Sequence, residues 1–362
     1  MNNRKKTIFD NWNVNSDNQP LIISGPCSAE SESQILSIGK ELKSLGVDVF
    51  RAGIWKPRTR PNSFEGVGSI GLPWLQLLKK EFGFKTAIEV ANSKHVDQAL
   101  NSEIDILWIG ARTSVNPFSI QEIADSLKGV DVPIFVKNPI NPDVDLWQGA
   151  IERIQGAGIS KIAAVHRGFS TYDKSVYRNK PMWELPIELR QRMPLIPMIC
   201  DPSHIGGRRG MIQEISQKAM DLNYDGLMIE SHIDPDNAWS DSDQQITPTQ
   251  LKTILEKLVL KFVEVDNLEV KNELKELRNQ IDYIDAELIN VLSQRMKVAN
   301  HIGKYKSINN ITILQPKRWK EVVKRTLELG ATEDLSSGFI SKVFSAIHQE
   351  SINKQTAYKI DK

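Results

Sequence analysis

Four residues of metal-ligand type follow short apolar runs in this chain. Cys27 follows PLIISG, and Glu230 follows GLMI. His204 comes shortly after PLIPMIC, and Asp241 lies in the segment beyond Glu230. A thiolate, an imidazole and two carboxylates suit a borderline divalent ion such as Mn, Fe, Co or Zn. Each residue alone is more often an ordinary packed side chain, but together they predict a metal site. Asp201 is expected to orient one of the ligands.

Cationic residues follow several of the other apolar runs. Arginine matches phosphate and carboxylate groups with two parallel hydrogen bonds, and lysine supplies a point charge. A solvated helix face is the alternative, but these residues follow apolar runs rather than helical ones. They therefore predict a strongly anionic ligand. Glu89 is the single acid among them, and either a cation or a water is its expected contact. The cations are Arg51, Lys56, Arg58, Arg112, Lys137 and Arg167.

The elements that must position these residues are β-strands alternating with helices. Eight apolar runs lie between residues 20 and 231, and each is followed by a stretch with helical spacing. This alternation predicts a parallel sheet, and eight units predict a closed (β/α)₈ TIM barrel with its catalytic residues at the C-terminal strand ends. The long loops 55–70 and 168–183 are expected to hold substrates. Helices are expected at 31–45, 71–82, 93–101, 118–128, 145–157, 184–192, 211–222 and 248–264.

The character of the chain changes near residue 265. Apolar residues then recur at three- and four-residue steps, which predicts a long amphipathic helix to about residue 306. Further helices are expected from about 316 and over 336–358, so an all-α domain follows the barrel. Such a domain buries little alone, and we expect half of an intertwined dimer or a lid on the barrel. The expected divisions are an N-terminal extension (1–19), a barrel (20–264), a linker (265–272) and a helical domain (273–362).

Composition narrows the class and the compartment. A net charge of +1 gives no reason to expect nucleic-acid or membrane binding. No apolar stretch follows the basic residues at the start, and no run approaches the roughly 20 residues of a membrane helix. Two cysteines are too few for a disulfide scaffold. A cytoplasmic enzyme is therefore expected.

Six short motifs in order resemble the compact branch of the 3-deoxy-D-arabino-heptulosonate 7-phosphate (DAHP) synthase family. The resemblance covers about 20–262 and implies condensation of phosphoenolpyruvate with erythrose 4-phosphate. The related enzymes that use arabinose 5-phosphate share the barrel but differ at the KPRT loop, so that aldehyde is the rival. The motifs are GPCS (25–28), KPRT (56–59), IGAR (109–112), HRGF (166–169), DPSH (201–204) and IESH (229–232).

The resemblance also implies roles for residues. The metal ligands would be Cys27, His204, Glu230 and Asp241. Phosphoenolpyruvate would lie among Arg51, Lys56, Arg112, Lys137 and Arg167. Erythrose 4-phosphate would meet Lys56, Pro57, Arg58 and Thr59. The metal would polarise the aldehyde, the enol carbon would attack it, water would add at C2 and phosphate would leave. Either Lys56 or Glu89 would handle the proton or the water.

The segment LRNQIDYIDAELINVLSQRMKVANHIGKYK resembles the all-helical chorismate mutase family, over about 270–358. Arg278 and Arg295 are seventeen residues apart, so they do not share one stripe of a helix. The resemblance implies that Arg278 enters the pocket from a partner subunit. The other pocket residues would be Arg295, Lys306, Arg318, Ser351 and Gln355. Arginines suit the two carboxylates of chorismate, while Lys306 and Gln355 suit the ether oxygen.

Two positions depart from the family pattern. Gln315 stands where an acidic residue is usual, and Trp319 stands where a glutamate is usual. The contact to the substrate hydroxyl is therefore left open. The sequence and the two resemblances together predict a bifunctional enzyme that is a homodimer or a higher homo-oligomer, with feedback by prephenate or chorismate. The alternatives are a helical domain that binds such a ligand without turning it over, and a helical domain that only dimerises.

Overall fold

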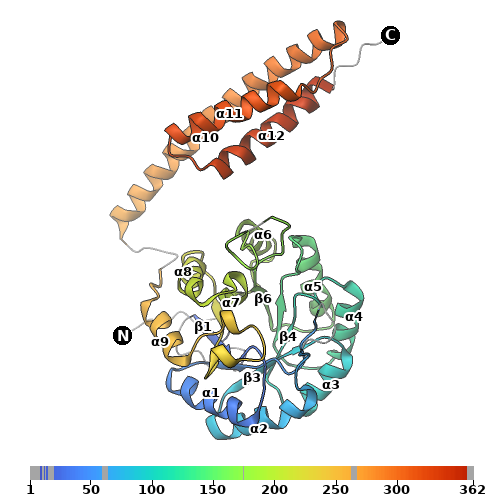
Figure 1. Cartoon of the computed structure of the whole chain (residues 1–362), viewed down its shortest axis with the longest axis vertical. Helices are drawn as coiled ribbons and strands as arrows, with labels where there is room; N and C mark the ends of the chain where they lie inside the picture. Colours follow the sequence, from blue (N-terminus) through green and yellow to red (C-terminus); the bar gives the residue numbers. More distant parts are fainter. Residues whose placement is uncertain are drawn as a thin grey trace. The chain divides into compact units, whose positions relative to one another are not determined.

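Eight short parallel strands form a closed barrel in the first part of the chain (Figure 1). Each strand pairs with the next, and β8 closes onto β1 with Leu21 opposite Gly226. This confirms the predicted (β/α)₈ architecture. The strands are β1 (Leu21–Gly25), β2 (Val49–Arg51), β3 (Lys85–Val90), β4 (Ile106–Ile109), β5 (Ile134–Lys137), β6 (Ile162–His166), β7 (Met198–Cys200) and β8 (Gly226–Glu230).

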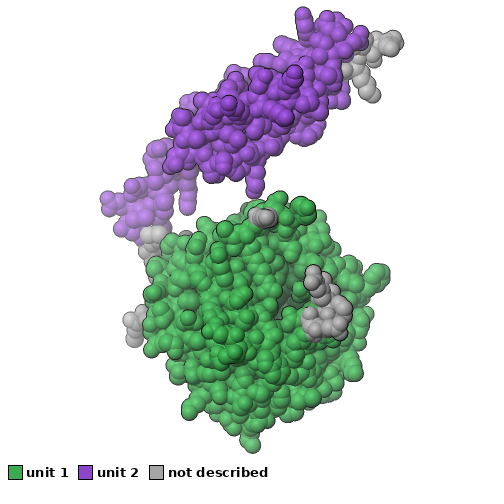
Figure 2. Space-filling model, in the orientation of Figure 1, with its two compact units in different colours: residues 1–263 green, residues 264–362 purple. Residues whose placement is uncertain are grey.

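The structure is a computed structural model that describes residues 9, 12, 14, 20–58, 64–173, 175–261 and 267–356. The chain divides into two compact units, residues 1–263 and 264–362 (Figure 2). Among the described residues, no helix is both long enough and apolar enough to cross a membrane.

Helices surround the strands of the barrel, and eight of them correspond to the expected segments (Figure 1). They are α1 (Glu32–Ser44), α2 (Gly71–Phe82), α3 (Ser93–Asn101), α4 (Pro117–Ser126), α5 (Val144–Gly156), α6 (Glu184–Arg192), α8 (Ile212–Asp221) and α9 (Pro248–Lys257). The last ends seven residues before the expected residue 264, because the chain turns extended at Leu258. The short α7 (Pro202–Gly206) was not predicted. Short 3₁₀ turns are η2 (Gly68–Ile70), η3 (Arg209–Met211), η4 (Pro235–Asn237) and η5 (Ser242–Gln244).

The interior of the barrel is filled by alternate residues of the strands. Successive side chains of a strand point to opposite faces, so one set packs inside and the other meets the helices. Trp108 and Phe135 belong to the inner cluster, together with Phe9 and Trp12 from the N-terminal segment. Ile22, Phe50 and Leu107 belong to the outer cluster. The inner cluster therefore fills the interior of the barrel.

The second unit consists of three helices, α10 (Leu268–Ile308), α11 (Pro316–Thr332) and α12 (Ser337–Thr356). The side chain of Asn267 accepts hydrogen bonds from the backbone N–H groups of Glu269 and Val270, and so caps α10. Residues 268–272, expected within the linker, are therefore helical. The helix α12 packs against both α10 and α11. Buried positions are few, and Ala299 and Gly303 are the two in α10.

One side of α10 is an exposed apolar stripe with alternating steps of four and three residues. This spacing is typical of a helix that packs along another helix over many turns. Arg295 occupies the position of the repeat between Val291 and Val298. The α10 stripe consists of Val270, Leu274, Leu277, Ile281, Ile284, Leu288, Val291, Val298, Ile302 and Tyr305.

Candidate active sites

The alternation of the strands decides which charged side chains reach the barrel mouth. In β2, β5 and β8, the inner-cluster residues Val49, Phe135 and Met228 lie two positions before the last residue. Because the side-chain period is two, the terminal residues Arg51, Lys137 and Glu230 point to the same inner face. Arg167 and Asp201 follow Val165 and Ile199 by the same step. The two-residue period therefore brings polar side chains at or just after the ends of β2, β5, β6, β7 and β8 to the barrel mouth.

The four predicted metal ligands come together at this mouth. Ligand atoms of Cys27, Glu230 and Asp241 all lie within 4.8 Å of one another. The Sγ of Cys27 lies 3.2 Å from Oδ2 of Asp241. The Nε2 of His204 lies 3.8 Å from Oε1 of Glu230. His204 projects from α7, the element that was not predicted.

Asp201 orients the His204 ring, as expected. Its Oδ2 lies 2.9 Å from Nδ1 of His204, and its Oδ1 accepts a hydrogen bond from the His204 backbone N–H at 3.1 Å. Lys137 Nζ donates to the same carboxylate at 2.8 Å. Burial opposes ionisation of Asp201, but His204 and Lys137 outweigh it and hold the pKa of this carboxyl well below its usual range. The carboxylate engages Nδ1, so Nε2 is directed toward Glu230.

The chemistry of these donors fits a divalent cation. Oε1 of the buried Glu230 accepts no hydrogen bond from any described residue, although Arg51 Nη1 lies 3.2 Å away. Burial is the main cause that raises the pKa of the Cys27 thiol to about 12, and the Glu230 charge contributes to this rise. Lys56 Nζ, 2.7 Å from Sγ, opposes it. A cation of charge two would favour the thiolate and would satisfy the Glu230 oxygen.

Sequence reasoning missed Arg178, which connects two of the metal-type residues. Its Nη1 lies 3.0 Å from Oδ1 of Asp241, a residue with a φ of +52°. The same Nη1 donates to Gln244 Oε1, and Gln244 Nε2 donates to Glu230 Oε2 at 2.7 Å. Arg178 follows no strand, so the strand-end rule could not find it. The available signal was its position in the long loop 168–183, which was expected to hold substrates. In the structure, a Cβ at Gly207 would lie 2.3 Å from the Cβ of Arg178.

The predicted cations line the same mouth. Arg51 and Lys137 lie over the Trp108 ring, 4.8 and 5.8 Å from its centroid. The Nε and Nη1 atoms of Arg51 are buried and make no hydrogen bond to a described residue, although Nη1 forms an ion pair with Glu230. Arg167 Nη1 donates to Asn179 Oδ1 at 2.7 Å. Burial is the main cause that lowers the pKa of Arg167 to about 10, and the guanidinium groups of Arg178 and Arg112 contribute to this lowering. Such unsatisfied donors favour an anionic ligand.

The loop that carries the KPRT motif adds further cations. Lys56 Nζ donates to the Cys27 carbonyl oxygen at 2.8 Å, and Arg58 Nε donates to the Phe64 carbonyl oxygen at 2.9 Å. Pro57 is half-buried, and Thr59 lies outside the described residues. Arg112 is exposed after β4, and its charge lowers the pKa of Arg167.

Glu89 lies among these groups and is held by Trp108. Trp108 Nε1 donates to Oε2 of Glu89 at 3.1 Å. A Cβ at Gly110 would lie 2.0 Å from Oε1 of Glu89, so only glycine leaves room for this carboxylate.

Of the predicted residues of the helical unit, Arg295 and Ser351 are in direct contact. Arg295 Nη1 donates to Ser351 Oγ, which links α10 to α12. Lys306 Nζ donates to the Ile313 carbonyl oxygen at 2.6 Å. Oε1 of Gln355 is buried without a hydrogen-bond partner among the described residues. Arg318 pairs with Glu321 at 3.0 Å, and Arg278 is exposed in the first half of α10.

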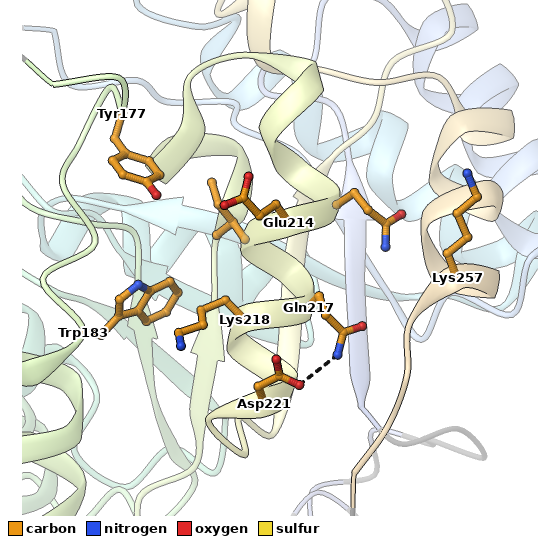
Figure 3. Close-up of a pocket in the computed structure, with 9 residues that line it drawn as sticks. Tyr177, Trp183, Glu214, Gln217, Lys218, Asp221 and Lys257 are labelled. Atoms are coloured by element: carbon orange, nitrogen blue, oxygen red, sulfur yellow. Dashed lines mark hydrogen bonds between the residues drawn. The ribbon is translucent and has the colours of Figure 1, made fainter. Parts of the chain in front are cut away.

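A cavity of about 570 Å³ lies on the outside of the barrel. Tyr177 and Trp183 face the side chains of Glu214 and Lys218 on α8 there, and Gln217 donates to Asp221 at 3.0 Å (Figure 3). The cavity holds none of the predicted site residues, although Tyr177 precedes Arg178 in the chain.

A closed (β/α)₈ barrel with clustered metal-type donors and buried cations defines an enzyme of anionic substrates, here joined to an all-helical domain. The chain belongs to the DAHP synthetase I family, whose sequence model matches residues 7–266. Residues 277–356 match the model of chorismate mutase type II. Both expected resemblances are thereby confirmed, and the chain carries two enzyme domains.

The relatives that match the barrel domain are enzymes with two different names. A phospho-2-dehydro-3-deoxyheptonate aldolase of Thermotoga maritima is 31% identical over 253 residues, which cover 70% of this chain and 73% of the relative. A 2-dehydro-3-deoxyphosphooctonate aldolase of Wolinella succinogenes is 28% identical, covering 66% of this chain and 98% of the relative. The crystal structure of the Thermotoga maritima DAHP synthase superposes with a TM-score of 0.59 at 28% identity, covering 72% of this chain and 69% of that one.

Proposed function

We propose that the barrel condenses phosphoenolpyruvate with erythrose 4-phosphate to give DAHP and phosphate, and that the helical domain rearranges chorismate to prephenate. The observation that carries the first reaction is the cluster of Cys27, Glu230 and Asp241, within 4.8 Å of one another, beside buried cations. Family membership of both domains supports the pair of activities.

The cations account for the binding of phosphoenolpyruvate. Arg51, Lys137 and Arg167 are buried, and Nε of Arg51 has no hydrogen-bond partner among the described residues. Carboxylate and phosphate oxygens would satisfy these donors with charge-assisted hydrogen bonds. Holding two mutually repelling anions in reach of one another removes an entropic and electrostatic part of the barrier.

Cys27, His204, Glu230 and Asp241 would hold a divalent ion, which would supply Lewis-acid polarisation of the aldehyde oxygen. The enol carbon of phosphoenolpyruvate forms a bond to the aldehyde carbon. Water then adds at C2, and phosphate leaves. Lys56, hydrogen-bonded to Cys27, would give a proton to the aldehyde oxygen. Glu89, held by Trp108, would orient the water. The ion itself would be Mn, Fe, Co or Zn.

Erythrose 4-phosphate is the proposed aldehyde, rather than arabinose 5-phosphate. The relatives include one enzyme named for the heptonate and one named for the octonate. Similarity of the barrel alone therefore does not distinguish the two aldehydes. The KPRT segment supports the shorter sugar. Arg58 is half-buried and lies two residues after Lys56, whose Nζ contacts Cys27, which suits contact with the distal phosphate.

The proposed rearrangement requires positive charge from the helical domain rather than a nucleophile or a metal. A pericyclic rearrangement needs neither, because bonds break and form within one molecule. Arg295 and Arg318 suit the two carboxylates, and Lys306 and Gln355 suit the breaking ether oxygen. The exposed α10 stripe supports a homodimer in which Arg278 of a second copy completes the pocket. Two free cysteines fit a reducing cytoplasm.

The test of both activities uses one preparation. Phosphoenolpyruvate, erythrose 4-phosphate and a divalent metal are mixed, and the loss of phosphoenolpyruvate is followed with and without chelator. The loss of chorismate is followed separately, with the same chelator. We expect chelation to stop the first reaction and to spare the second. Full synthase turnover by metal-free enzyme would contradict the metal assignment.

Feedback between the domains is also proposed, with prephenate or chorismate as the inhibitor of the synthase. Such coupling is reciprocal for binding and is typically worth about 1–3 kcal/mol. The synthase rate is measured against prephenate concentration for the full chain and for Arg295→Ala. The full chain should be inhibited, and the variant should respond only at higher concentration. A flat response of the full chain would remove the regulatory claim.

A further inference from the structure

The residue that departs most from the expected mutase pocket is stacked on a histidine. The ring of Trp319 in α11 lies 3.9 Å from the ring of His348 in α12, with an interplanar angle of 13°. Trp319 directly follows Arg318, one of the expected pocket residues. The position that usually carries a glutamate therefore supports a second side chain instead of reaching a ligand as an acid.

The outer nitrogen of this histidine has no partner. Nε2 of His348 is buried and makes no hydrogen bond to any described residue. In the described part of the helical unit, Gln355 Oε1 is the other side-chain atom in this condition. A buried polar atom without a partner costs roughly 1–3 kcal/mol. Both atoms are therefore candidates for contact with a bound molecule.

The two atoms lie on one face of α12. His348, Ser351 and Gln355 are separated by three and four residues, which places them along one side of a helix. Ser351 on this face receives the guanidinium group of Arg295. The Cα of Gln355 lies against Gly303 of α10, where a Cβ would be 2.7 Å from it. The unpaired nitrogen of His348 therefore belongs to the face that carries the proposed mutase residues.

The chemistry of His348 suits a neutral polar group. Partial burial lowers its pKa, and the charges of Arg295 and Lys306 lower it further. The ring is therefore neutral at pH 7, with one nitrogen as donor and the other as acceptor. An alcohol, which both donates and accepts, matches either tautomer. Trp319 offers only an N–H donor of its own, and its stacked ring fixes the plane of the imidazole.

We propose that His348 binds the ring hydroxyl of the cyclic dicarboxylate, and that Trp319 acts as the positioning residue for its imidazole. This inference rests on the proposed mutase function and assigns a specificity-determining residue within it. In this proposal, His348 of α12 makes the contact that a glutamate at position 319 of α11 would otherwise make.

The experiment compares two substrates, chorismate and its analogue with hydrogen in place of the ring hydroxyl. His348→Phe keeps a stacked ring but removes both nitrogens. We expect it to lower kcat/KM for chorismate by about tenfold, the equivalent of one lost hydrogen bond in a buried site, and to change the analogue by less than about twofold. His348→Gln retains a donor and an acceptor and should recover part of the loss. Equal losses on both substrates would overturn the inference, because a structural role does not distinguish them.

Two further measurements keep this test separate from the proposed function. Trp319→Phe should preserve discrimination between the substrates, and Trp319→Ala should reduce it. If Trp319→Ala leaves discrimination unchanged, the positioning role is wrong. If the wild-type chain turns over no chorismate, the proposed mutase function fails. The His348 comparison is then made on the dissociation constants of the same two compounds, where equal weakening again overturns the inference.

Discussion

Nζ of Lys56 donates to Sγ of Cys27 at 2.7 Å and to the carbonyl oxygen of the same residue at 2.8 Å. One lysine therefore holds both the donor cluster and the start of the KPRT segment. A cation bound at Cys27 would compete with Lys56 for the thiolate and release its ammonium group toward the substrate. In the proposed mechanism, metal binding and preparation of the aldehyde site would be linked through this contact.

The first prediction concerns the pH dependence of metal affinity. Burial raises the pKa of Cys27 to about 12, so the thiol is protonated at neutral pH. His204 has a lowered pKa, so its ring is already neutral there. Binding then expels about one proton, and affinity should rise roughly tenfold per pH unit between about pH 6.5 and 9. Calorimetric titration with Co²⁺ in buffers of different ionisation enthalpy measures this release. Cys27→Ser should bind weakly and lose the slope, and a pH-independent wild type would contradict the prediction.

The second prediction concerns Arg178. Arg178→Gln removes the ion pair to Asp241 and the contact to Gln244, which together hold two proposed ligands. Loss of such supporting contacts typically weakens metal binding about 10- to 100-fold. We expect this weakening in a direct titration with Mn²⁺, independent of turnover. Arg208→Gln is the matched control, since Arg208 is exposed and directly follows Gly207, the glycine that lies against Arg178. Equal affinities for the two variants would exclude the role.

The third prediction concerns the aldehyde. Arg58→Ala should raise KM for erythrose 4-phosphate by roughly 10- to 100-fold, since a charge-assisted contact to phosphate is worth about 1.5–3 kcal/mol. KM for phosphoenolpyruvate should change little. Initial rates with each substrate varied in turn measure both constants. An equal effect on the two substrates, or preference of the wild type for arabinose 5-phosphate, would argue against this assignment.

The fourth prediction concerns sharing of the mutase pocket between subunits. Arg278→Ala and Arg295→Ala should each be nearly inactive alone. In a mixed dimer, one of the two pockets receives both wild-type arginines and the other receives neither. Random exchange should therefore restore about a quarter of wild-type mutase activity. No recovery, in a mixture whose exchange is verified with tagged subunits, would show that the pocket lies within one chain.

The strand-end residues were predictable because a period of two needs only the local pattern. Arg51, Lys137 and Glu230 point inward by counting from apolar residues of their own strands. Arg178 was not predictable in this way, because its position depends on a loop that contacts α7 and η5, two elements that lie further along the chain. Helical spacing gave the extent of α10 but not the burial of His348 Nε2. That burial depends on the packing of α12 and on the stacked ring of Trp319 in α11.

The α10 stripe has a consequence for how the chain folds. The described core residues of the barrel all come from the first unit, so that core is formed within one chain. Within the described residues of its own unit, the stripe leaves large apolar side chains such as Ile281 and Tyr305 more than half exposed. Covering them with a second copy is bimolecular, and its free energy depends on protein concentration. A newly made chain would then complete its barrel first and wait for a second chain before its helices reach full stability. At low expression levels, the helical unit would be the part most open to proteases.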